Sequence, residues 1–171
     1  MPRRRASDRS GLAPLVNVEV AVAGAHAEAD RAFVKTLGRR CVMSSVASLR
    51  PTSEANARAA FDRLCEIVES QPHATLIARR AGKRVGFLLL LDELPDEVTL
   101  LPQAFVAYMA VEPGARRDGI GAALLAAAEN EARRRRLPYI SLMVTEENEA
   151  ARRLYARAGY QTERRLLCKP V

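Results

Sequence analysis

The segment that most constrains the fold is PGARRDGIGAALL, residues 113–125, in which two glycines one residue apart stand between two apolar stretches. The stretch before it, QAFVAYMAV at 103–111, has the short apolar pattern of a buried strand. An alanine- and leucine-rich helix is predicted from about Gly119 to Arg136, and YISLMVT at 139–145 is predicted to be a second strand. A strand, a helix and a strand in this order form a right-handed parallel unit. The two glycines should lie at the start of the helix in this unit.

The rest of the chain is predicted to add strands and helices on both sides of this unit. The order is β-α-α-β-β-β-α-β-α-β, which is typical of an α/β chain with a mixed (α+β) sheet and helices on both faces. The remaining strands are expected at 16–23, in a β-hairpin over 74–94 and, last, at 160–168; helices are expected at 27–40, at 52–70 after Thr52 or Ser53, and after Asn148 as far as Gly159.

Length and composition restrict the classes of protein. With 171 residues, about half of them apolar, the chain is expected to form a single domain over 15–171 after a mobile basic arm at 1–14. Neither a secretory signal nor an apolar run long enough for a membrane span is found. Three scattered cysteines, Cys41, Cys65 and Cys168, and two histidines give no metal-site or disulfide pattern, so a cytoplasmic protein with inert thiols is expected.

The net charge of +7 comes almost entirely from arginine and raises the question of a nucleic-acid partner. The densest run, Arg133–Arg136, falls in the last turn of the predicted helix, where cations interact well with the helix dipole. Glu129 and Glu131 precede two of these arginines by four residues, which is a favourable pairing on a helix. The run is therefore interpreted mainly as a solvated helix end, and nucleic-acid binding is kept as a minor alternative.

The two glycines indicate a phosphate site, and three kinds are considered. A dinucleotide fingerprint requires a small residue where Leu124 stands, and seven residues, 112–118, separate the strand from the first glycine. A P-loop requires lysine after the second glycine, where Ala122 stands. The third is a pyrophosphate cradle, in which backbone N–H groups, the helix N-terminus and arginine bind the anion. Its members would be Arg116, Arg117, Asp118, Gly119, Ile120, Gly121 and Ala122.

Two motifs resemble those of the GNAT acetyltransferase superfamily. MAVEPGARRDGIGAALL matches the family's Arg/Gln-x-x-Gly-x-Gly/Ala signature after a strand that ends in Val-x-Pro. NEAARRLYARAGY matches its Asn-x-x-Ala-x-x-Leu-Tyr-x-x-x-Gly-Phe/Tyr motif. The resemblance covers about residues 15–168, with the specific motifs inside 105–160. It implies the GNAT fold and an acyltransferase that moves an acetyl group from acetyl-CoA to a primary amine by direct attack, with homodimers common among relatives.

The resemblance also assigns roles. In the family two parallel strands splay apart around the cofactor, so the backbone of Met109 and Val111 would bind the pantetheine arm. The Val111 N–H would polarise the thioester carbonyl. Asn148 would line the cofactor side, and it is also a plausible helix N-cap. Tyr155 would act as the general acid that protonates the leaving thiolate, although its helical spacing also fits a core tyrosine.

The acceptor side is left open by the sequence. Many relatives have a glutamate base six residues before the valine of Val-x-Pro, where this chain has Phe105. Gln103 and Tyr108 are near but are poor bases. The acidic loop LDELPDEV offers four carboxylates as candidate bases: Asp92, Glu93, Asp96 and Glu97. The same carboxylates could attract a cationic amine. The acceptor is therefore either a small-molecule amine or a protein or peptide amine, and a non-catalytic acyl-CoA-binding module is the main alternative.

Overall fold

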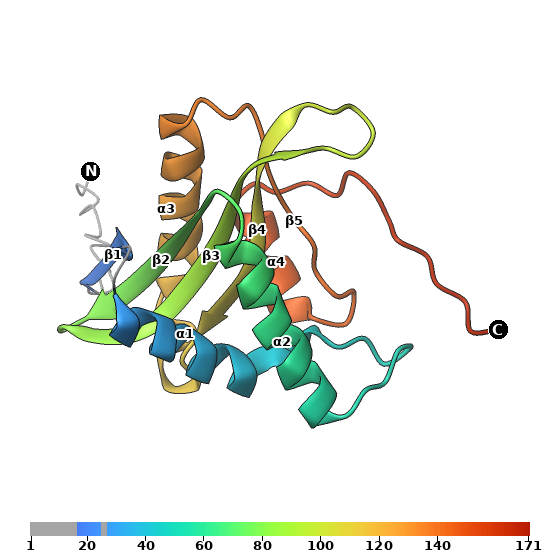
Figure 1. Cartoon of the computed structure of the whole chain (residues 1–171), viewed down its shortest axis with the longest axis horizontal. Helices are drawn as coiled ribbons and strands as arrows, with labels where there is room; N and C mark the ends of the chain where they lie inside the picture. Colours follow the sequence, from blue (N-terminus) through green and yellow to red (C-terminus); the bar gives the residue numbers. More distant parts are fainter. Residues whose placement is uncertain (1–16, 25–26) are drawn as a thin grey trace, which may run out of the picture.

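The computed structural model describes residues 17–24 and 27–171 of the chain. These residues form one five-stranded sheet with helices packed on it (Figure 1). Its strands lie side by side in sequence order, each antiparallel to the next except for the parallel last pair. They are β1 (Val18–Val22), β2 (His73–Arg80), β3 (Lys83–Pro95), β4 (Pro102–Val111) and β5 (Ile140–Leu142). The predicted mixed sheet is thus confirmed, as is the β-hairpin of β2 and β3.

Helices cover both faces of the sheet, as the sequence predicted (Figure 1). On one face, α1 (Glu28–Cys41) and α2 (Glu54–Glu69) enclose a core around Phe61 and Phe87, whose side chains are fully buried. On the other face, α3 (Ile120–Arg134) buries Leu124 against the sheet, and α4 (Glu149–Arg157) packs beside it. Ser53 caps α2 by accepting a hydrogen bond from the Asn56 N–H, at 3.1 Å.

The two parallel strands stay together for only three residue pairs. Ala104, Phe105 and Val106 pair with Ile140, Ser141 and Leu142. Beyond this point β4 continues as far as Val111, whereas the chain after Leu142 leaves the sheet. The strand predicted at 139–145 is therefore shorter than expected, and the end of β4 has no strand beside it on that side among the described residues.

A bulge in β4 lies where the strands part. Leu89 of β3 is opposite Tyr108 and Leu90 is opposite Val106, so that Ala107 is an extra residue on β4. An extra residue of this kind changes which face the following side chains point to. As a result, Tyr108 packs on the α1 and α2 face, while Met109 packs on the α3 face.

The last strand predicted, at 160–168, is wrong. After α4, Gly159 adopts a left-handed φ of +90°, and residues 161–171 extend without regular structure. Leu166 and Leu167 are adjacent, so a strand would turn them to opposite faces, and both are more than four-fifths exposed, at 84% and 87%. Arg164 instead binds two carboxylates of the β3–β4 loop.

Some expectations concern other parts of the chain. The basic arm at 1–14 lies outside the described residues. Across the described residues, no helix combines the length and the apolar character that a membrane crossing requires. The three cysteines are free; Cys41 and Cys65 are buried and Cys168 is exposed.

Candidate active site

The exposed backbone at the end of β4 is the first part of the site. The Glu112 N–H donates to the Val85 carbonyl of β3 at 2.9 Å, so the alternation of a strand turns the Val111 and Met109 N–H groups the other way. On that side β5 has already ended. Met109 and Val111, which the sequence assigned to the cofactor arm, therefore have their backbone groups along the opening between the two strands.

The start of α3 is the second part. Gly119 is the N-cap, with a left-handed φ of +78° and no side chain that caps the helix. The first helical hydrogen bond runs from the Ala123 N–H to the Gly119 carbonyl, at 3.0 Å. The N–H groups of Ile120, Gly121 and Ala122 therefore have no partner inside the helix, and the positive end of the helix dipole lies at the same place. A helix start of this kind can bind an anion, so the pyrophosphate cradle at these residues stays a prediction.

The two glycines of the turn are required for different reasons. A Cβ added to Gly119 would meet no atom within 4 Å, so this position is open to solvent or to a ligand. A Cβ added to Gly121 would lie 2.8 Å from Cδ2 of Leu154. Gly121 thus lets α4 pack against the first turn of α3, next to Tyr155. The prediction that glycine serves close approach of a ligand fits Gly119, whereas Gly121 serves the packing of two helices.

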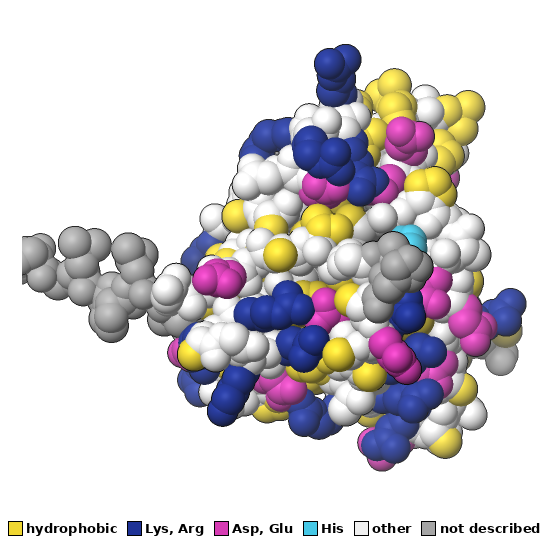
Figure 2. Space-filling model, turned by 60° about the vertical axis from the view of Figure 1, so that its left-hand side comes forward, with side chains coloured by type: hydrophobic (Ala, Val, Ile, Leu, Met, Phe, Trp, Pro, Cys, Tyr) yellow, Lys and Arg dark blue, Asp and Glu magenta, His cyan; other side chains and the backbone are white. Residues whose placement is uncertain are grey.

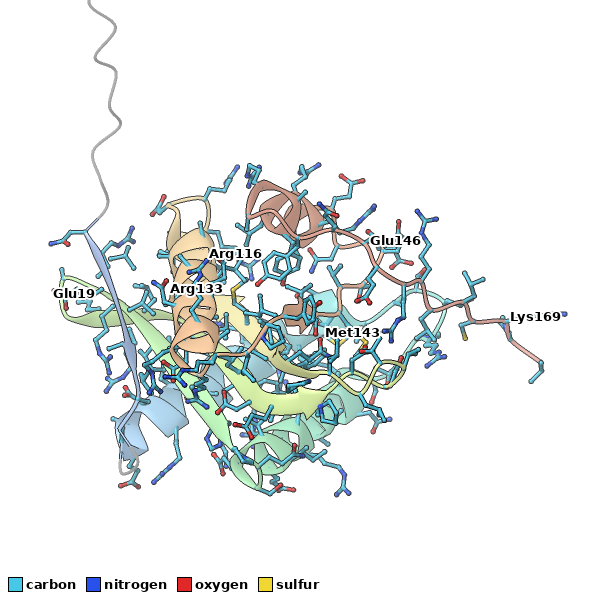
Figure 3. All side chains as sticks on the ribbon, turned by 90° about the horizontal axis from the view of Figure 1, so that it is seen from above. Glu19, Arg116, Arg133, Met143, Glu146 and Lys169 are labelled. Carbon is cyan, nitrogen blue, oxygen red and sulfur yellow. The ribbon has the colours of Figure 1, made fainter. Side chains whose placement is uncertain are left out.

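Two charged residues of the turn, Arg116 and Asp118, bind other groups of the chain. Arg116 donates from Nε to the Val111 carbonyl at 3.3 Å and from Nη2 to Sγ of Cys41 at 3.5 Å. Its guanidinium group, labelled in Figure 3, therefore joins the end of β4 to α1. Asp118 accepts from Arg80 at 2.6 Å, and Arg117 is exposed, with a left-handed φ of +69°.

Asn148 and Tyr155 lie on the segment that completes the opening. Asn148 caps α4 as predicted, because its side chain accepts from the Ala151 N–H at 3.2 Å. Its Nδ2 also donates to the Ser44 carbonyl at 3.4 Å. Tyr155 is half-buried on the α3 side of the sheet, with its ring 5.9 Å from that of Tyr160. Burial raises the pKa of Tyr155, so its phenol is protonated at neutral pH, as a general acid must be.

Two loops far apart in sequence are joined beside the opening. The Thr145 hydroxyl donates to the Ser45 carbonyl at 2.8 Å, and the Ser48 N–H donates to Glu147 at 3.0 Å. The Ser48 hydrogen bonds lower the pKa of Glu147. Met143 and Glu146, labelled in Figure 3, mark the course of the loop between β5 and α4 that takes part in this junction. The junction could not be predicted from the sequence, because it depends on contacts between residues about one hundred positions apart.

Tyr108 is the residue at the opening whose position the sequence did not reveal. Its ring packs against Phe61, with ring centroids 4.9 Å apart, and against Phe87, at 6.0 Å. Ser45 is the polar side chain beside its hydroxyl group. Burial raises the pKa of Tyr108 to about 12. The only sequence signal is a tyrosine in an apolar strand; the bulge that aims it is not visible there.

The acidic stretch predicted as a loop lies partly in β3, which contains Asp92 and Glu93 and extends to Pro95, so only Asp96 and Glu97 belong to the β3–β4 loop. Arginines of the chain largely neutralise this stretch. Asp92 is buried and paired with Arg135. Arg164 binds Asp96 at 2.6 Å and Glu97 at 3.1 Å. Three of the four carboxylates proposed as a base or as an attraction for a cationic amine thus have an arginine partner; the fourth, Glu93, is exposed.

The basic run is engaged in the same way. Arg133 pairs with Glu129 at 3.0 Å, and Arg134 and Arg135 both bind Glu131, which is buried. On the face that Figure 2 shows, Lys and Arg side chains are interspersed with Asp and Glu side chains. A solvated helix end with internal pairs is therefore the better description of this run.

The described residues contain no group of three or more histidine, cysteine or acidic side chains that could hold a metal ion. His73 has Nδ1 at 2.8 Å from the Gln71 carbonyl, consistent with a structural role at the start of β2.

Comparison with known families now identifies the chain. The sequence pattern described as the acetyltransferase (GNAT) family matches residues 44–160. The chain belongs to the GNAT family. No match was found among curated protein sequences. The match covers both motifs that carried the resemblance and every residue assigned above to the site.

Solved structures agree with this GNAT assignment. A protein from Pyrococcus furiosus assigned as an acetyl transferase is 26% identical, with a TM-score of 0.75, over 90% of this chain and 99% of that one. A ribosomal-protein-alanine N-acetyltransferase from Brucella melitensis biovar Abortus 2308 is 21% identical, with a TM-score of 0.61, over 90% and 99%. The enzyme AAC(6')-Iy, solved with a bisubstrate analogue of CoA and acetylneamine, is 18% identical, with a TM-score of 0.65, over 90% and 97%. The fold of this chain is thus that of the GNAT acetyltransferases, and its family supports acyl-CoA binding and acyl transfer.

Proposed function

We propose that this GNAT protein is an acetyl-CoA-dependent N-acetyltransferase that transfers the acetyl group to a primary amine by direct attack, without a covalent enzyme intermediate. One observation carries the proposal. Val111 and Tyr155 pack on the same side of the sheet as α3, whose first turn is uncapped, and β4 has no parallel neighbour beyond Val106. Acetyl-CoA supplies an activated thioester, and each of these groups meets one of its chemical requirements.

The residues present fit a bound coenzyme A. The N–H groups of residues 120–122 and the open surface at Gly119 suit a pyrophosphate, and Arg116 and Arg117 add positive charge. The backbone of Met109 offers the pantetheine arm a strand edge. The Val111 N–H would donate to the carbonyl oxygen as negative charge develops on it. Tyr155, held protonated by burial, would give its proton to the leaving sulfur.

Two classes of acceptor are compatible with the family. One of the structural neighbours is an aminoglycoside acetyltransferase in complex with sisomicin, and another is a ribosomal-protein-alanine N-acetyltransferase. Both kinds of acceptor present an amine, so this chain is proposed to act on an amine of a small molecule or of a protein. A non-catalytic acyl-CoA-binding module is the second candidate, and Phe105 favours it, because the family's glutamate base is missing there.

A thiol-release assay with acetyl-CoA tests the proposal. Sisomicin, neamine, free lysine and a peptide that begins with alanine serve as acceptors, and calorimetry measures acetyl-CoA binding. Tyr155→Phe should retain binding and lose most of the rate, on the order of 10²-fold or more. Tyr139→Phe, at an exposed tyrosine, is the matched control and should retain both. Binding of acetyl-CoA without release for any acceptor would support the binding module instead.

A further inference from the structure

Tyr108 lies at the point where β4 loses its parallel neighbour. The last pair between the two strands is Val106 with Leu142, and the bulge at Ala107 follows immediately. Because of this bulge, the Tyr108 side chain is on the α1 and α2 face. Tyr155 is on the opposite face, beside α3.

This placement divides the opening into two sides. On the α3 side lie Tyr155 and the start of α3, which the proposed function assigns to the thiol and the pyrophosphate. On the other side lie Tyr108 and the Ser45 loop. An acceptor must approach the thioester carbon from a side that the leaving sulfur and its acid do not occupy. The Tyr108 side meets that condition.

The surroundings of Tyr108 indicate the protonation state of what binds there. The polar and titratable groups that act on it are Ser45, Cys41 of α1, Arg116 and Tyr155 of α4; its remaining neighbours include the rings of Phe61 and Phe87. None of these groups is a carboxylate. Desolvation at this partly buried position and the positive charge of Arg116 disfavour an ammonium ion and favour a neutral amine.

We propose that Tyr108, with Ser45, receives the acceptor as a neutral amine on the side of β4 opposite Tyr155. The inference rests on the proposed function and adds the residue that positions the acceptor. The ammonium proton is lost to solvent before binding, so no carboxylate base is required. When the C–N bond forms, the C–S bond breaks and Tyr155 protonates the sulfur. The nitrogen passes one proton to the Tyr108–Ser45 hydroxyl pair and thence to solvent, and Tyr155 regains a proton from solvent.

The hydroxyl is what the test must remove, because the ring also supports the core. Tyr108→Phe keeps the packing on Phe61 and should leave the melting temperature and the Kd for acetyl-CoA unchanged. The KM for the acceptor should rise about tenfold, the value of one lost hydrogen bond, and kcat should fall with it. Ser45→Ala should reproduce part of the effect. Tyr139→Phe should change neither constant.

The pH profile separates this role from a structural one. For a neutral amine, kcat/KM rises until the pH reaches the pKa of the amine itself, about 8 for an alanine α-amine and about 10.4 for the side chain of lysine. The pH at which the profile levels off should therefore move with the acceptor. A profile that levels off near pH 6–7 for both would show an enzyme base and overturn the inference, as would an unchanged acceptor KM in Tyr108→Phe. Failure of the proposed function is distinct, because wild type would then release no thiol.

Discussion

Replacing Gly119 by alanine distinguishes an effect on acetyl-CoA affinity from an effect on the stability of the fold. Gly119 has a left-handed φ of +78°, and a Cβ there would meet nothing within 4 Å. The only cost to the free protein is the left-handed conformation of a residue with a side chain, about 1–2 kcal/mol. For a chain of this size, the melting temperature should fall by about 2–8 °C.

Gly82 provides a matched control for this substitution. It has a φ of +74°, and its Cβ would also meet nothing within 4 Å, but it lies in the turn between β2 and β3. Gly82→Ala should therefore lose as much stability as Gly119→Ala. Only Gly119→Ala should lose affinity for acetyl-CoA, because its methyl group would stand in front of the N–H groups at the start of α3. Losing one charge-assisted hydrogen bond at about 1.5–3 kcal/mol predicts a Kd that is roughly 10- to 100-fold higher.

The assay is calorimetric titration with acetyl-CoA, alongside thermal unfolding of both variants without ligand. An equal Kd for Gly119→Ala and wild type would refute the placement of the pyrophosphate at this turn. Equal losses of affinity in the two variants would refute it as well, because the loss would then reflect reduced stability rather than the site.

Three further predictions concern stability and reactivity. In Gly38→Ala the new Cβ would lie 1.9 Å from Cζ of Phe61, whose ring is fully buried, so chemical denaturation should show a loss of about 2–3 kcal/mol. Burial raises the pKa of Asp30, but hydrogen bonds and charges from Arg84 and Arg79 outweigh it and lower the pKa overall. The stabilisation from these ion pairs is therefore complete above about pH 4 and is lost as the pH falls below it. Asp30→Asn should flatten that part of a curve of stability against pH. Burial raises the pKa of the Cys65 thiol to about 11, so a thiol reagent should modify exposed Cys168 first and Cys65 only on unfolding. The expected homodimer stays a prediction, which sedimentation equilibrium can test.

The cofactor side of the site was predictable because its signals are local in sequence. The signals are a left-handed glycine at a helix start, an N-cap asparagine and a tyrosine seven residues after it. Each of them depends on residues that are close to it in sequence. Gly119, Asn148 and Tyr155 accordingly occur in the structure where the sequence placed them. The mixed sheet and its parallel pair could also be predicted, because a strand, a helix and a strand in succession form a right-handed parallel unit.

Features that depend on distant contacts could not be predicted. The bulge at Ala107 arises from the pairing of β4 with β3, and nothing in QAFVAYMAV distinguishes a regular strand from a bulged one. The expected strand at 160–168 was inferred from apolar content, but in the structure Arg164 binds Asp96 and Glu97, two residues more than sixty positions away. A carboxylate count likewise could not show that Asp92 is already paired with Arg135.

This difference explains why the family can be read from the sequence and the acceptor cannot. The groups proposed to bind coenzyme A are backbone atoms and helix ends, whose geometry a short motif determines. The groups proposed to face the acceptor come from three separate places. Tyr108 lies on a bulged strand, Ser45 ends the 3-10 helix Val42–Ser45 after α1, and Thr145 donates to the Ser45 carbonyl from the segment between β5 and α4. Each of these positions can change without altering either motif. Members of the family that share the motifs are therefore expected to differ in acceptor, and the Tyr108 side is where this chain's own selectivity should be sought.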